Sequence, residues 1–217
     1  MKIRLRNFCA MLLCVGVAGG TLTACAPIIF GGAAMSALVA TDRRTSGAQL
    51  EDEGIELRAA GRIRESLGDR VHINVTSYNR QVLVTGEVSN AQNKQLVEQI
   101  VSRVENVRSI VNEVALLEST TLTQRSSDAL TTGKVKAAMV DAKDLYSNAF
   151  KVVTERGTTY LMGLVTQREA TRATDIARGT GGVLKVVRVF EIISEAELQR
   201  TLPQSAPASL PSAAPKT

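Results

Sequence analysis

The chain has few residues of the types that perform nucleophilic or metal chemistry. Its one histidine, His72, lies between apolar residues in a β-rich run, and two of its three cysteines, Cys9 and Cys14, lie in an apolar N-terminal run with the form of a cleaved signal. Only Cys25 would remain in the mature chain. A single histidine without a free thiol excludes Cys–His catalysis and the His/Cys zinc clusters. We therefore expect no catalytic residue, no metal site and no enzymatic activity.

Two other clusters have the composition of a ligand site. The acidic run Glu-Asp-Glu at residues 51–53 could hold a cation, but the helical pattern that follows predicts the charged first turn of a helix, where carboxylates meet the positive end of the helix dipole. Gly179, Gly181 and Gly182 precede an expected strand rather than a helix, unlike a phosphate-cradling loop. They predict a tight turn into that strand.

Cys25 is the residue with the clearest chemistry. Basic residues precede an uncharged apolar run that ends in Leu-Thr-Ala-Cys at residues 22–25, which is typical of a secretory signal. This ending resembles the lipobox of bacterial lipoproteins, whose cysteine carries a diacylglycerol and, after cleavage, an acyl chain such as palmitate on its amino group. The alternative, a transmembrane anchor, is disfavoured by the glycines in the run and by its length. By resemblance, Ala26 implies sorting to the outer membrane, and the lipid on Cys25 is the only attached group expected.

The chain divides into five segments by composition and by repetition of one pattern. Helical and strand signals follow each other twice in the order α-β-β-α-β, with the first helix of the first copy marked by Ile55, Ala59, Ile63 and Leu67. The predicted segments are a signal peptide at 1–24, a lipidated tether at 25–49, modules at 50–118 and 126–193, and a disordered Pro/Ala/Ser tail at 203–217.

The same joint between strand and helix recurs in both modules. Gly86 and Gly163 each follow the second expected strand, where a residue without Cβ lets the chain bend or approach a neighbouring backbone. Each joint then carries an expected capping box, formed by Ser89 with Gln92 and by Thr166 with Glu169.

These patterns predict an α+β fold of two tandem modules, each with a three-stranded mixed sheet packed on two helices. A module of about 70 residues has a marginal core, so we expect the two to pack on each other. The core must be aliphatic, because only 3% of residues are aromatic. The chain also has few aromatic side chains on which nucleic-acid bases could stack, which argues against a nucleic-acid partner.

The glycine after the second strand and the closing strands near residues 105–114 and 182–189 resemble the BON domain of bacterial envelope proteins. The order of lipobox, ATDRRTSGAQLEDE at residues 40–53 and two such modules is similar to the dual-BON outer-membrane lipoproteins associated with division, outer-membrane stress and lipid binding. The resemblance implies a lipid-anchored, periplasm-facing protein that supports envelope integrity, acts at the division site, and binds phospholipid through the first helix of its second module.

Charge separates the two modules. Residues 50–118 have eight basic and eleven acidic residues, whereas residues 126–193 have ten basic and seven acidic ones. The second module therefore suits an anionic surface such as phosphatidylglycerol or cardiolipin. On its first helix, expected to begin near residues 126–128, the candidate lipid contacts are Leu130, Lys134, Lys136 and Lys143.

Two alternatives to lipid binding stay open. The basic helix could be a solvated face, with Leu130 as an apolar staple at the start of the helix. The modules could also be protein-interaction scaffolds for the outer-membrane assembly machinery or for peptidoglycan enzymes. A large aromatic at position 130 would anchor more strongly among lipid headgroups than leucine does.

Overall fold

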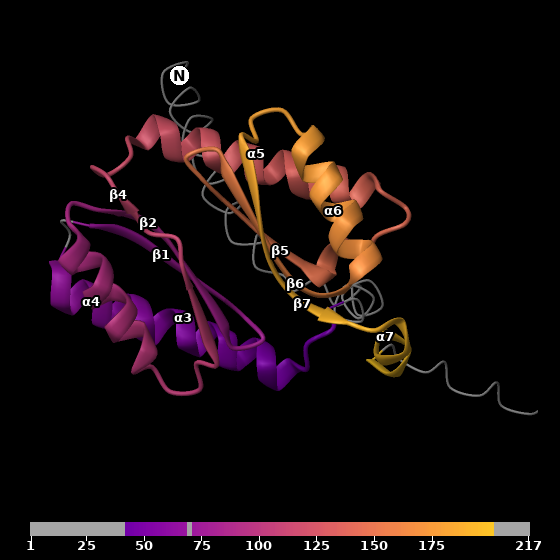
Figure 1. Cartoon of the computed structure of the whole chain (residues 1–217), viewed down its shortest axis with the longest axis horizontal. Helices are drawn as coiled ribbons and strands as arrows, with labels where there is room; N and C mark the ends of the chain where they lie inside the picture. The colour runs from indigo at the N-terminus through magenta and orange to yellow at the C-terminus, as the bar shows by residue number, and fades with distance from the viewer. Residues whose placement is uncertain (1–41, 69–70, 202–217) are drawn as a thin grey trace, which may run out of the picture. The chain divides into compact units, whose positions relative to one another are not determined.

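The computed structural model describes residues 42–68 and 71–201 of the chain. The predicted signal, Cys25, most of the tether and the Pro-rich tail lie outside these residues. All described residues belong to one compact unit, Leu38–Thr217, which contains two copies of an α-β-β-α-β order (Figure 1). The predicted fold class is confirmed.

The first module contains two helices and a sheet of four short strands. Its elements are α3 (Ser46–Leu67), β1 (His72–Tyr78), β2 (Gln81–Val88), α4 (Ala91–Ser102), β3 (Ser109–Asn112) and β4 (Ala115–Leu116). Strand β2 is central: it pairs antiparallel with β1 and parallel with β3 and β4. The sequence predicted one closing strand over residues 107–117; it is split because the side chain of Asn112 accepts the backbone N–H of Val114.

The second module repeats this arrangement with three strands, of which the closing one is a single unbroken strand. Its elements are α5 (Leu122–Asp141), a short 3-10 turn η3 (Ser147–Ala149), β5 (Phe150–Glu155), β6 (Thr158–Thr166), α6 (Gln167–Gly179) and β7 (Lys185–Ile193), followed by α7 (Glu195–Thr201). Strand β6 is central, antiparallel to β5 and parallel to β7. Helix α7 was not predicted; its buried Leu198 is a single apolar anchor, too little for a periodic signal.

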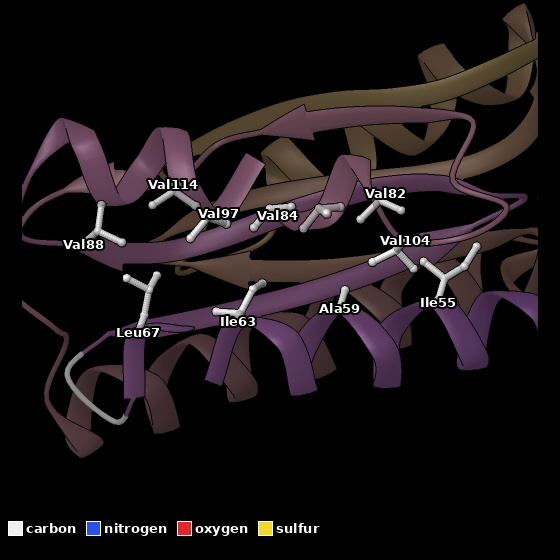
Figure 2. Close-up of a cluster of buried hydrophobic side chains, with 11 residues drawn as sticks. Ile55, Ala59, Ile63, Leu67, Val82, Val84, Val88, Val97, Val104 and Val114 are labelled. Atoms are coloured by element: carbon white, nitrogen blue, oxygen red, sulfur yellow. The ribbon is translucent and has the colours of Figure 1, made fainter. Parts of the chain in front are cut away.

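Each core lies between the sheet and its two helices (Figure 1). In the first module the four predicted α3 residues are at most 6% exposed, and Figure 2 shows their side chains pointing toward the strand that carries Val82, Val84 and Val88. Helix α3 begins at the cap Thr45, whose hydroxyl accepts the Ala48 N–H, and ends at Gly68 with a φ of 64°. It therefore starts inside the segment that was predicted to be tether.

The two joint glycines lie within the strands, not after them. Gly86 in β2 has a φ of 113°, and a Cβ there would lie 1.9 Å from the carbonyl oxygen of His72. A Cβ on Gly163 in β6 would lie 2.5 Å from the carbonyl oxygen of Ala149. Close approach of the neighbouring strand thus requires glycine at both positions, as the sequence indicated.

The two predicted caps have different outcomes. Thr166 and Glu169 form the expected capping box at the start of α6, with both reciprocal hydrogen bonds present. The box predicted for Ser89 and Gln92 is wrong. Helix α4 is capped one residue later by Asn90, which accepts the Asn93 N–H at 2.8 Å. Asparagine is as good an N-cap as serine, and the sequence Ser-Asn offers both.

The faces of the two sheets that carry no helix pack together, as expected for two small modules. Tyr78 and Leu83 of the first sheet form a buried cluster with Tyr160, Met162 and Val189 of the second. Polar contacts surround this cluster: the Tyr78 hydroxyl donates to the Ala149 carbonyl, Lys151 pairs with Glu56 at 2.6 Å, and Arg108 pairs with Glu191 at 2.5 Å.

Candidate functional site

The outer face of α5 carries an exposed apolar surface. Leu130 is 68% exposed, so it is neither a core residue nor a staple at the start of the helix, which begins eight residues earlier at Leu122. A shallow hollow of about 740 Å³ lies beside it. Its lining is formed by Ser126, Ala129, Leu130, Gly133, Lys134 and Ala137. We call this surface the α5 hollow.

The small residues of the α5 hollow have no packing function that the structure shows. A Cβ added to Gly133 would meet no atom within 4 Å. Glycine inside an exposed helix costs about 1 kcal/mol relative to alanine. Together with Ala129 and Ala137, one turn away on either side, Gly133 keeps the helix backbone close to the surface, so a flat partner can approach it.

The predicted lysines are only partly brought together. Lys134 lines the α5 hollow next to Leu130 and has no ion pair among the described residues. Lys136 lies on another side of α5, at a separate hollow that it shares with Asp42 and Gln49. Lys143 is not on the helix, contrary to the prediction, because α5 ends at Asp141. The structure therefore groups Leu130 with Lys134 and leaves the other two apart.

The acidic run at 51–53 is not the first turn of a helix, because α3 begins five residues before it. Asp52 is 1% exposed and is surrounded by donors: it accepts the backbone N–H groups of Asn79 and Arg80 and the Ser77 hydroxyl, and it pairs with Arg44 at 2.7 Å. Burial works to raise the pKa of Asp52, but these hydrogen bonds outweigh it and lower the pKa.

A short segment before α3 was missed by the sequence analysis and contacts both modules. Arg43, whose side chain is 3% exposed, donates to both carboxylate oxygens of Glu169 at 2.8 and 2.6 Å and to the Leu164 carbonyl. Arg44 contacts the first module, pairing with Asp52 and lying 4.2 Å from the Tyr78 ring centroid. These contacts could not be predicted, because Arg43 and Arg44 lie in the segment that was predicted to be tether and have no periodic pattern around them.

Glu169 thus performs two tasks, since it closes the α6 capping box and binds Arg43. Burial opposes the charged form, while the Arg43 guanidinium and the Thr166 N–H favour it, and the net effect lowers the pKa of Glu169.

The glycines near 179–182 fulfil the expected structural role. Gly182 has a φ of 102° in the turn between α6 and β7.

The described residues hold no helix that is long and apolar enough to span a membrane. The fold and the exposed α5 hollow define a tandem repeat of one α+β module, with the modules joined sheet to sheet and a surface on the second that is open to a partner.

The BON domain family matches the chain twice, at residues 53–118 and 127–194. The chain therefore belongs to the BON domain family, among its dual-BON lipoproteins. It is similar to the outer membrane lipoprotein DolP of Haemophilus influenzae, with 34% identity over 79% of this chain and 90% of that protein. It is also similar to a 21 kDa hemolysin of Actinobacillus pleuropneumoniae, with 29% identity over 70% and 79% of the two chains.

Among solved structures, CdsD, a structural protein of the type III secretion system of Chlamydia trachomatis, aligns over 68% of this chain and 99% of its own. The identity is 12% and the TM-score 0.27, so the alignment carries no conclusion about this chain.

Proposed function

We propose that the protein is a lipid-anchored lipoprotein of the outer membrane, facing the periplasm, whose α5 hollow binds anionic phospholipid such as phosphatidylglycerol or cardiolipin. The observation that supports this most is the exposed Leu130 beside Lys134, which forms no ion pair with residues 42–68 or 71–201. No cofactor is needed beyond the diacylglycerol and acyl chain expected on Cys25.

The physical basis is an apolar side chain next to a cation on an accessible helix face. Leu130 would enter the headgroup region while the Lys134 ammonium contacts phosphate oxygens. Each lysine near an anionic surface contributes about 1 kcal/mol. The contact is weak by itself, but an anchor on Cys25 keeps the modules at high effective concentration near the membrane, so a weak contact is enough to select lipid composition.

The biological role we propose is support of envelope integrity at the division site. Kinship with an outer-membrane lipoprotein supports the location. Enrichment of anionic lipid in part of the membrane would concentrate a protein that binds it, and this gives the α5 hollow a positioning role rather than a chemical one.

Vesicle binding tests the proposal. Residues 38–217, which form one compact unit without the anchor, are mixed with vesicles of neutral lipid or of increasing phosphatidylglycerol or cardiolipin content, and co-sedimentation is measured. We expect binding that rises with anionic lipid, falls with salt, and is lost in Leu130→Glu. Lys134→Glu should weaken it by about tenfold or more, because it removes one cation and adds a repulsive charge.

The matched control is Leu57→Glu on α3, since Leu57 is a 75% exposed leucine on the first helix of the other module. It should leave vesicle binding unchanged. Absence of binding at low salt, or equal loss in Leu57→Glu and Leu130→Glu, would refute the lipid proposal. Either result would favour the protein-interaction scaffold for outer-membrane assembly or peptidoglycan machinery instead.

A further inference from the structure

Where the two sheets meet, one histidine and two glutamates come together. His72 and Glu87 are direct neighbours in the register of β1 and β2, and their side chains are 3.0 Å apart, from Nδ1 to Oε2. Glu155, the last residue of β5 in the other module, lies next to them. Each residue offers one ligand atom, and these three atoms lie within 4.8 Å of one another.

Negative charge in this cluster is not fully compensated. Glu155 has no ion pair with a lysine or arginine among residues 42–68 and 71–201; its carboxylate accepts a hydrogen bond from the Asn74 amide. Arg156 lies 3.4 Å from the other oxygen of Glu87.

A second observation concerns a buried polar group on the same pair of strands. Thr85 is 1% exposed, and its hydroxyl has no hydrogen-bond partner within the described part of the chain. It is two residues from Glu87 on the same face of β2, directly opposite Asn74 in the register. A buried hydroxyl without a partner costs about 1–3 kcal/mol and is rare in folded proteins.

The cluster is also accessible. A hollow of about 330 Å³ opens beside it, lined on one side by His72 and Asn74 of the first module and on the other by Glu155, Asp128, Thr132 and the basic Arg125. An ion therefore has a path to the ligand atoms without separation of the two modules.

We propose that His72, Glu87 and Glu155 form a binding site for a divalent transition-metal ion of the zinc type, which joins the two modules. Imidazole nitrogen and carboxylate oxygen are both zinc ligands, with bonds of about 2.0–2.2 Å, which place neighbouring ligand atoms about 3 to 3.5 Å apart. The 3.0 Å between Nδ1 and Oε2 is close to this spacing, and the ligand atom of Glu155 lies within 4.8 Å of both.

The neighbours of Glu87 are compatible with a bound ion. The Oε2 atom also accepts from the backbone and hydroxyl of Thr120, while Oε1 keeps Arg156. Such hydrogen bonds orient a carboxylate that binds metal through one oxygen. This assignment departs from the expectation that the chain has no metal site, because the ligands come from β1, β2 and β5 and no sequence spacing joins them. It is independent of lipid binding by α5.

Calorimetric titration with Zn²⁺ alone tests the site. The full chain is used without a histidine tag and with Cys9→Ser, Cys14→Ser and Cys25→Ser, because thiolates bind zinc. We expect one equivalent of Zn²⁺ per chain and a higher midpoint of thermal unfolding when it is bound. His72→Gln and Glu155→Gln should each weaken binding by at least about tenfold.

Glu53→Gln, which changes an exposed carboxylate on α3, is the matched control and should bind Zn²⁺ as the parent does. The nitrogen resonances of the His72 ring provide a readout on the unaltered site, even if a variant fails to fold, and they should shift on zinc addition. Absence of saturable Zn²⁺ uptake, an unshifted His72 ring, or unchanged affinity in both ligand variants would overturn the proposal.

Discussion

Helices α3 and α5 occupy the same place in their modules and have diverged on their outer faces. Asp52 in α3 accepts the backbone N–H groups of Asn79 and Arg80, and Asp128 in α5 accepts those of Arg156 and Gly157. Both aspartates therefore hold the turn between the first two strands of their module, and they give a common reference for comparing the helices residue by residue.

Aligned on these aspartates, the helices differ where the α5 hollow lies. Leu130 corresponds to Gly54, and Lys134 corresponds to Arg58. Arg58 pairs with Glu51 at 2.6 Å and with Glu105 at 3.6 Å. A Cβ on Gly54 would lie 2.9 Å from the Arg58 guanidinium, so this side chain covers the glycine. In the first module Arg58 is neutralised by ion pairs and lies over a glycine. At the equivalent place in the second module, Leu130 is exposed beside Lys134, which has no ion pair among the described residues.

The shared aspartates predict the largest effects. Asp52→Ala should lower the free energy of unfolding by about 2 to 4 kcal/mol, because it leaves two turn amides and the Ser77 hydroxyl without their acceptor and leaves Arg44 with Asp42 as its remaining ion-pair partner. Asp128→Ala should cost about 1.5 to 3 kcal/mol, since Asp128 accepts the two turn amides and Gln124 but pairs with no arginine side chain in the described part of the chain. Urea unfolding of residues 38–217 measures both. Equal losses would show that the Arg44 contact contributes little.

Acidification should weaken both modules through one carboxyl group each. The pKa values of Asp52 and Glu169 are lowered from 3.8 and 4.5 in the folded state. Each group therefore contributes stability that is present above its unfolded pKa and is lost as the pH falls through its folded pKa.

The urea midpoint should consequently be flat near neutrality and fall below about pH 4. Asp52→Asn and Glu169→Gln should lower stability at pH 7 and each reduce this acid dependence. A midpoint that falls equally steeply in both variants would mean that other carboxyl groups control acid unfolding.

The repeat itself could be predicted because it rests on local patterns. Apolar residues every fourth position in α3, the alternating strands, and the capping box at Thr166 depend on neighbours a few residues away. The choice of Asn90 over Ser89 as a cap could not be predicted, because both residue types are good caps and they are adjacent in the sequence.

The sites escaped prediction where they depend on contacts between distant segments. Arg43 binds Glu169, 126 residues away, and Glu155 meets His72 only because the sheets pack face to face. Leu130 and Lys134 could be proposed from sequence, because Leu130 lies outside the apolar core stripe of its helix, lysines follow it, and the family resemblance implies that this helix binds lipid. Lys143 was misplaced because the end of α5 carries no sequence signal as strong as a glycine or proline.

The smallest expected effect is also the sharpest test of what separates the modules. Gly54→Leu, made together with Leu130→Glu, recreates on α3 the leucine that the second module has lost. Glycine to leucine inside a helix stabilises it by up to about 1 kcal/mol, and the displaced Arg58 side chain is flexible, so folding should be preserved.

Binding to anionic vesicles should recover only slightly, because Arg58 remains paired with Glu51. Adding both Glu51→Gln and Glu105→Gln removes the two carboxylates that pair with Arg58 and should increase recovery by about a further threefold to tenfold. If this quadruple variant binds no better than Leu130→Glu alone, an exposed leucine beside a cation without these ion pairs is not sufficient, and the small residues around Gly133 must then be part of what the lipid surface recognises.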